Sequence, residues 1–283
     1  TEDGPQTPFA ELGFSLGEFE FNRYQFKTGG QTGNLNYYIN GSYLNYDGFR
    51  QHSDVKHGTL NSKFRYKFSD GSVGQLIIRT TDSPEAQDSG GLNAGEVAAD
   101  RRAARQRNVD LDSGEEVNDQ KVAWSWKKEF GVHSLSLRNY YNWRDFYARL
   151  PLPPFAGTGI TQFERFFYGG GAQYGNTSAL FGHDNRITIG VDVDTMTDDR
   201  QRFNNLSGSQ GALGFSQDEN ADTVGIFMQE EFALSQQVNL QAGLRYDHVK
   251  FDVEDKFLAN GDQSETIKFN ELNYSFGAMY SPF

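Results

Sequence analysis

The 283-residue sequence contains no cysteine, and it has no run of uncharged apolar residues long enough to cross a membrane as a helix. The missing cysteine excludes disulfide crosslinks, thiolate metal sites and cysteine nucleophiles. The missing apolar run excludes a transmembrane helix, which needs about 18 or more such residues. A membrane strand would escape this second test, because only every second residue of a β-barrel strand faces lipid.

Positive charge is also scarce. There are 26 Lys and Arg residues against 38 Asp and Glu residues, which gives a formal net charge of −12. A nucleic-acid-binding protein needs a basic surface that neutralises phosphates, so this class is excluded. Aromatic residues, by contrast, make up 14% of the chain. Disordered chains are poor in aromatic residues, and we therefore expect a folded protein.

Apolar and polar residues alternate with a period of two along most of the chain. For example, Leu135, Leu137 and Tyr141 alternate with Ser136 and Arg138. A strand places each of these sets on one face, whereas a helix would scatter them round its circumference. The pattern predicts about twelve strands, at 8–16, 19–29, 34–46, 57–68, 73–82, 120–130, 132–147, 162–176, 185–196, 222–234, 238–253 and 267–280.

Short and long connections alternate between these segments. Short Gly-, Ser- and Asp-rich turns follow every second strand from the second onward, and long connections lie between them at 47–56, 83–119, 148–161, 197–221 and 254–266. Short periplasmic turns and long extracellular loops are typical of outer-membrane barrels, whose strands need about 9–11 residues to cross the bilayer. A soluble β-sandwich is the alternative fold, but it offers no reason for the loops to segregate. We therefore predict an all-β, antiparallel up-and-down transmembrane barrel in contact with outer-membrane lipid.

Several segments, in this order and spacing, resemble the TonB-dependent outer-membrane receptors of the ferric-citrate or siderophore type. They are FNRYQFKTGG at 21–30, YYINGSY at 37–43, DGFR at 47–50, GGL at 90–92, ADRRAAR at 99–105, DSGEE at 112–116, LRNYYNWRDF at 137–146, RLP at 149–151, GVDVD at 190–194, DRQRF at 199–203 and LRYD at 244–247.

The resemblance implies a 22-stranded barrel plugged by an amino-terminal domain, located in the bacterial outer membrane. Residues 1–283 are then expected to form about 12 of these strands as one partial barrel domain, without the plug and with a long extracellular loop at 83–119. The implied function is energy-coupled uptake of a ferric siderophore or ferric citrate, with the TonB complex acting only through the missing amino-terminal region. The alternatives are a passive porin-like channel and, as a third class, an enzymatic or adhesive barrel.

The loop 83–119 contains the candidate ligand-binding residues. A helical run from Ala94 to Arg107 would place Arg101, Arg105 and, less closely, Arg102 on one side. Guanidinium groups are well suited to anionic chelates such as ferric citrate, because they bind carboxylates bidentately. The alternative is a solvated helix whose arginines pair with Glu96, Asp100 and Asp110. The candidate ligand-binding set is Arg101, Arg102, Arg105, Arg107, Arg144 and Arg149, and Arg165, Arg200 and Arg202 could join it.

Signals for metal sites and catalysis are weak. The acidic residues Asp110, Asp112, Glu115 and Glu116 lack the spacing of a calcium loop. The five histidines show no zinc-binding motif, and no G-x-S-x-G sequence is present. We therefore expect no enzyme activity, no cofactor and no metal site.

Overall fold

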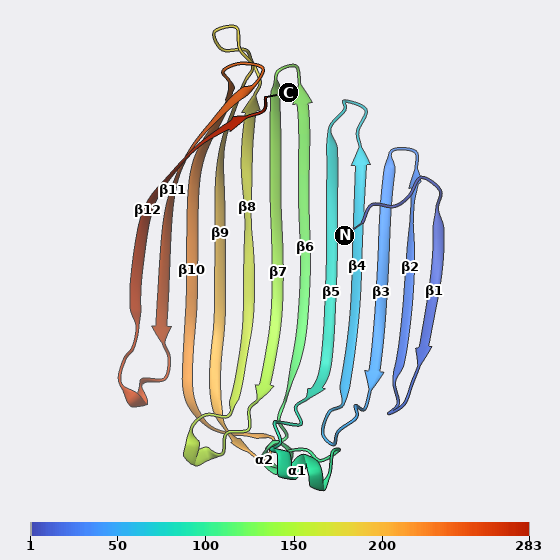
Figure 1. The fold of residues 1–283 in the computed structure, drawn as a ribbon. Helices are drawn as coiled ribbons and strands as arrows, with labels where there is room; N and C mark the ends of the chain where they lie inside the picture. Colours follow the sequence, from blue (N-terminus) through green and yellow to red (C-terminus); the bar gives the residue numbers. More distant parts are fainter. Residues whose placement is uncertain (1, 283) are drawn as a thin grey trace.

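The computed structural model describes residues 2–282 and contains one antiparallel sheet of twelve strands, ordered as they occur in the sequence (Figure 1). The predicted number of strands and their up-and-down order are confirmed. The strands are β1 (Phe9–Leu16), β2 (Asn22–Thr32), β3 (Leu35–Tyr46), β4 (Val55–Lys67), β5 (Val73–Gln87), β6 (Gly114–Phe130), β7 (His133–Arg149), β8 (Ile160–Asn176), β9 (Asn185–Leu206), β10 (Ser209–Ala233), β11 (Val238–Asp255) and β12 (Glu265–Tyr280).

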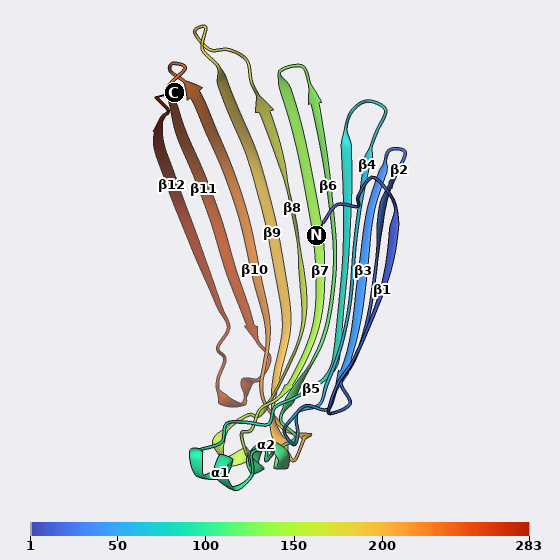
Figure 2. The same cartoon turned by 45° about the vertical axis from the view of Figure 1, so that its right-hand side comes forward.

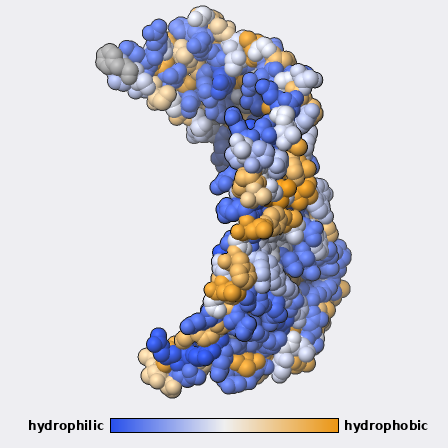
Figure 3. All heavy atoms as spheres, turned by 90° about the vertical axis from the view of Figure 1, so that its right-hand side faces the viewer, coloured by the Kyte–Doolittle hydropathy of each residue, from blue (hydrophilic) through white to orange (hydrophobic). Residues whose placement is uncertain are grey.

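The sheet is curved into an open trough. Figures 1 and 2 together show β1 and β12 in front of the central strands. Figure 3, seen from the β1 side, shows that the upper and lower ends of the molecule also project to one side. Within residues 2–282, β1 pairs only with β2 and β12 only with β11, so the two edge strands do not meet. The structure is therefore a barrel wall that does not close on itself.

The two faces of the trough differ in chemistry. Apolar side chains such as Val122, Ile226 and Leu244 lie on the convex face, where they are 44%, 59% and 46% exposed. The concave face is polar. Residues 2–8 run inside the trough, where Asp3 binds Lys63 and Arg65 of β4. A strand exposes alternate residues to lipid and to the interior of a barrel, which accounts for the period of two in the sequence.

The connections differ in length between the two ends of the sheet, as predicted. At one end, called here the turn end, the strands are joined at 33–34, 68–72, 131–132, 177–184 and 234–237. The opposite end, the loop end, has connections at 17–21, 47–54, 88–113, 150–159, 207–208 and 256–264. The long loop predicted at 83–119 is shorter, because β5 and β6 continue toward each other up to Gln87 and Gly114.

The prediction of a long connection at 197–221 is wrong. Strands β9 and β10 extend through this region as one hairpin, which turns at Ser207 and Gly208 with positive φ angles of 51° and 89°. Here polar residues outnumber apolar ones on the hairpin, as in the sequence TDDRQR at 197–202. Since the extension lies beyond the apolar part of the wall, it has no alternating pattern by which the sequence could reveal it.

The prediction of one helix from Ala94 to Arg107 is also wrong. Helix α1 spans Ala94–Ala99, and helix α2 spans Gln106–Asp110. Between them, Asp100 is extended, and its side chain accepts a hydrogen bond from the backbone N–H of Arg102 at 2.8 Å. Such local bonds from Asp compete with helix hydrogen bonds and end the helix. The helices in residues 2–282 are all too short to cross a membrane.

The turn between β4 and β5 contains a titratable contact outside the apolar wall. Asp70 accepts hydrogen bonds from Lys128 Nζ and Ser72 Oγ, both at 2.7 Å. These contacts lower the pKa of Asp70 below its ordinary value of 3.8, with the Lys128 bond as the largest cause. A carboxyl group whose pKa is lowered by folding stabilises the folded state above its unfolded pKa, and this contribution is lost as the pH falls.

We therefore expect the stability difference between the wild type and Asp70→Asn to be present at pH 6 and to shrink once the pH falls below about 4. Urea unfolding in detergent at several pH values measures this difference. A difference that stayed constant between pH 6 and pH 3 would contradict the assignment.

Candidate binding site at the loop end

The connection 88–113 is held to its neighbour by one arginine. Arg50, in the connection between β3 and β4, donates Nη1 to Gly90 O at 2.7 Å and Nη2 to Ser89 O at 3.2 Å. It also donates Nε and Nη2 to Ala103 O at 3.0 and 2.9 Å. All these acceptors are backbone carbonyls. A planar guanidinium with five donors can bind several carbonyls at once, so Arg50 fixes both ends of the segment 89–103.

A second set of contacts joins the far side of the same loop to the wall. His52 Nε2 lies 2.8 Å from Ser113 O, and Ser113 Oγ donates to Arg149 O at 3.0 Å. Asn108 is 2% exposed and donates Nδ2 to Asp88 O at 3.1 Å and to Asp88 Oδ2 at 3.0 Å. Buried polar groups need such partners, and Asn108 finds its partner, Asp88, at the other end of the same connection. The loop is consequently a fixed part of the fold.

Asn205, near the tip of the β9–β10 hairpin, connects two further segments. Its side chain is completely buried, and Nδ2 donates to Leu111 O at 2.8 Å and to Leu150 O at 3.2 Å. Its Oδ1 accepts from the backbone N–H of Gly208 at 2.8 Å. One side chain thus ties together the hairpin turn and the connections 88–113 and 150–159. We call the four joined segments, 47–54, 88–113, 150–159 and 205–208, the loop layer.

The loop layer lies across the mouth of the trough. Figures 1 and 2 show α1 displaced from the sheet toward its concave side, and α2 close to the strand ends. A solute that entered the trough from this end would pass the loop layer first.

The four candidate arginines of the loop do not share one face of a helix. Arg101, Arg105 and Arg107 are exposed, and within residues 2–282 no carboxylate lies within ion-pair distance of them. Arg102 is also exposed, but its Nε donates to Phe49 O at 3.1 Å and its guanidinium lies 5.0 Å from the ring centroid of Phe19. The expected pairing with Glu96, Asp100 and Asp110 is not formed in the described part of the chain. Instead, Glu96 caps α1.

The candidate arginines of the wall are neutralised by carboxylates. Arg144 binds Asp119 at 2.8 Å, and Arg149 binds Glu116 at 2.7 Å and Asp112 at 3.2 Å. Two of the acidic residues that were compared with a calcium loop, Asp112 and Glu116, therefore form ion pairs with Arg149.

The other wall arginines are held in similar ways. Arg165 binds Asp198 at 2.5 Å, Arg200 lies 3.6 Å from Glu219, and Arg202 stacks at 4.7 Å on Phe215. Arg50 and Asn205, by contrast, were not identified from the sequence. Each resembles any surface arginine or asparagine until the partner segments, which are distant in sequence, are placed beside it.

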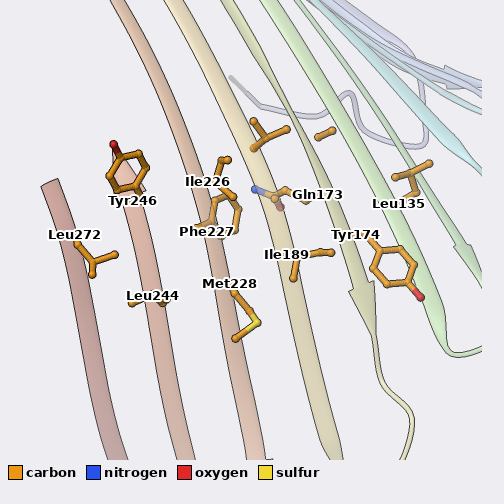
Figure 4. A pocket seen from close by; sticks show the side chains of 13 residues that line it. Leu135, Gln173, Tyr174, Ile189, Ile226, Phe227, Met228, Leu244, Tyr246 and Leu272 are labelled. Atoms are coloured by element: carbon orange, nitrogen blue, oxygen red, sulfur yellow. The ribbon is translucent and has the colours of Figure 1, made fainter. Parts of the chain in front are cut away.

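A shallow groove on the convex face has a different character. Figure 4 shows its lining, in which side chains from β7 to β12 lie side by side. The residues are almost all apolar and include Ile189, Ile226, Met228, Leu244 and Leu272. They belong to the alternating apolar set and lie on the opposite face from the polar interior. The groove is therefore part of the surface that contacts lipid.

Comparison with known proteins identifies the family. The model of the "TonB dependent receptor-like, beta-barrel" family matches residues 67–283. Among solved structures, the ferric citrate transporter FecA in its unliganded form superposes with a TM-score of 0.73 at 14% identity, over 97% of this chain and 41% of that one. The siderophore receptor PiuA from Acinetobacter baumannii gives 0.74 at 9% identity, over 100% and 48%. FpvA from P. aeruginosa, bound to heterologous pyoverdines, gives 0.74 at 12%, over 98% and 41%.

The chain thus spans roughly half the length of the solved receptors that it matches, and at these identities the likeness shows the shared fold. The family is one of non-enzymatic transporters, which agrees with the expectation that the chain is not an enzyme. The chain belongs to the TonB-dependent receptor β-barrel family, and its twelve strands form part of a barrel wall in the bacterial outer membrane.

Proposed function

We propose that the protein takes up ferric chelates, either siderophores or ferric citrate, across the outer membrane, and that the TonB complex energises this uptake in the whole receptor. The observation that carries the proposal is the loop layer, which is fixed by Arg50 and Asn205 and lies over the mouth of the trough. Preformed surfaces bind with a smaller loss of conformational entropy than mobile loops. The names of the matched structures, a ferric citrate transporter and siderophore receptors, support the same substrate class.

Within the loop layer, Arg101, Arg105 and Arg107 are the proposed contacts for the ligand. They are exposed and have no carboxylate partner in residues 2–282, so they are available to an anionic chelate. Arg102, Arg144 and Arg149 complete the candidate set in a supporting role, because each is already bound within the protein. In the proposed site, the first three arginines contact the ligand, and the other three support the surrounding structure.

Replacing Arg101, Arg105 and Arg107 together with glutamine in the whole receptor is expected to weaken binding of ferric citrate by at least about 10-fold, since the loss of even one charged hydrogen bond to the ligand costs about 1.5–3 kcal/mol. Isothermal titration with ferric citrate and with a ferric catecholate chelate measures the effect. Lys127→Gln at the turn end is the control, because Lys127 pairs with Glu129 far from the loop layer. Unchanged affinity for both chelates would rule out these arginines as ligand contacts.

A further inference from the structure

Positive charges on the concave face are neutralised in a regular way. Lys27 pairs with Glu11 at 3.2 Å, Arg138 with Asp192 at 2.6 Å, and Arg245 with Asp247 at 2.8 Å. Lys63, Arg144 and Arg165 are bound to Asp3, Asp119 and Asp198 in the same way. The wall thus supplies a carboxylate for most of the cations along the middle of its inner face.

Arg79 on β5 and Lys121 on β6 depart from this pattern. They are direct partners in the antiparallel register and project from the same, concave face. Both are exposed, and no carboxylate within residues 2–282 lies within ion-pair distance of either. Their outer neighbours in the register are the neutral residues Asn61 on β4 and Asn142 on β7. The result is an uncompensated pair of cations on the inner wall.

Another pair of opposed cations on the same face shows how the wall treats such charges. Arg144 and Arg165 are also direct partners, on β7 and β8. Each has its own carboxylate, Asp119 and Asp198, whose side chains are 12% and 1% exposed. Like charges placed directly opposite each other destabilise a sheet, and the two carboxylates remove that cost. No such groups accompany Arg79 and Lys121 in the described residues, so the two cations are open to an anion inside the trough.

Other concave-face cations without an ion pair in residues 2–282 do not form a comparable site. They are Arg23, Lys67, Arg186 and Arg202, and they lie toward the ends of their strands. Arg186 faces Glu231 in the register, and none of the four faces a second cation. Arg79 and Lys121 are therefore distinguished by position as well as by charge.

The geometry of the pair suits one oxyanion. Directly opposed residues in an antiparallel pair have Cβ atoms about 5 Å apart, so the two long side chains can converge on a single group. Arg79 offers a planar fork of donors, and Lys121 adds a compact charge. The ammonium of Lys121 lies 5.8 Å from the ring centroid of Tyr140, whose hydroxyl donates to Asp194. An aromatic face thus borders one side of the pair.

We propose that Arg79 and Lys121 form a carboxylate-binding station on the inner wall, distinct from the loop layer. The inference rests on the proposed function in one respect, namely that an anionic solute passes through the trough. Two sources could supply the carboxylate. One is a solute such as citrate in transit, and the other is a carboxylate side chain of a segment of the receptor that occupies the trough.

The test uses the whole receptor carrying Arg101→Gln, Arg105→Gln and Arg107→Gln, so that the loop layer does not contribute to anion binding. In this background, three proteins are compared: the otherwise unmodified protein, the Arg79→Gln/Lys121→Gln variant and the Lys127→Gln control. Iron-free citrate is titrated into each of them. The stability of each without citrate is measured by urea unfolding. A difference in gel migration between unheated and heated samples in detergent confirms that each variant folds. Arg79→Lys, which retains the charge, should retain most of the binding.

A loss of citrate affinity of at least about tenfold in the double variant alone, without a loss of stability, supports the station with a solute as its occupant. Unchanged citrate affinity with lower stability supports it with an internal carboxylate as the occupant, because that group then loses its partners. Unchanged citrate affinity with unchanged or raised stability overturns the proposal. Iron-free citrate reports on this station even if the receptor transports a different chelate, so its failure is distinguishable from failure of the proposed function.

Discussion

Replacing Asn205 with alanine is expected to loosen three segments of the loop layer at once. The substitution removes the side-chain bonds to Leu111 O, Leu150 O and the backbone N–H of Gly208, and it leaves these groups in a site where Asn205 itself is completely buried. Each buried polar group that loses its partner costs about 1–3 kcal/mol, and partial access of water reduces the sum to about 2–4 kcal/mol. We expect hydrogen exchange in residues 88–113 and 150–159 to accelerate accordingly, by about 30- to 900-fold.

Hydrogen exchange followed by mass spectrometry measures this change segment by segment. Asn204→Ala is the matched control, because the side chain of Asn204 makes no hydrogen bond within the described residues. If Asn205→Ala and Asn204→Ala gave the same exchange in the segment 88–113, Asn205 would have no special role. Weaker binding of the ferric chelate in Asn205→Ala alone would further link the loop layer to the proposed function.

Replacing Gly169 with alanine is expected to destabilise the middle of the barrel wall. A Cβ atom added there would lie 2.6 Å from Val193 O and 2.8 Å from the Tyr140 hydroxyl, and it would come even closer to Asp194 Oδ1. Tyr140 and Asp194 are joined by a hydrogen bond across β8, directly over Gly169. The new methyl group must therefore displace this contact or the backbone of β9, at a cost of about 1–3 kcal/mol.

Equilibrium unfolding in urea, started from the folded protein in detergent, measures this cost as a lower midpoint at an unchanged slope. Gly91→Ala is the matched control, since no atom lies within 4 Å of the position of its added Cβ. Equal midpoints for the two variants would show that Gly169 has no steric role in the wall.

Much of the wall could be predicted from the sequence. The period of two arises because lipid contacts one side of each strand and a polar interior contacts the other, so each residue's polarity reports its face. The twelve strands follow from this local signal, and their sequential order follows from the short turns that join every second pair. For example, the alternation of Leu135 and Leu137 with polar residues assigns them to the lipid-facing side without knowledge of the neighbouring strands.

The signal failed where the chain leaves the apolar part of the wall. Residues 197–206 continue β9, but their mostly polar side chains do not alternate with apolar ones, so their pattern resembled a loop. Likewise, the run from Ala94 to Arg107 had helical composition, yet Asp100 and Arg102 made other contacts and ended the helix. The ladder to neighbouring strands extends β9, whereas the local bond of Asp100 and the contact of Arg102 with Phe49 end the helix.

The sequence by itself determined the class of the protein, its strands and the sites of its connections, because lipid and turn geometry act on residues close in the chain. Only the tertiary structure decided which cations are free. Arg144 and Arg149 are bound by carboxylates from β6 and the connection before it, whereas Arg79 and Lys121, on adjacent strands, share no such partner in residues 2–282. An arginine's role depends on the charges around it in space. Strand register places such charges side by side from distant positions, as with Arg79 and Lys121, which are 42 residues apart.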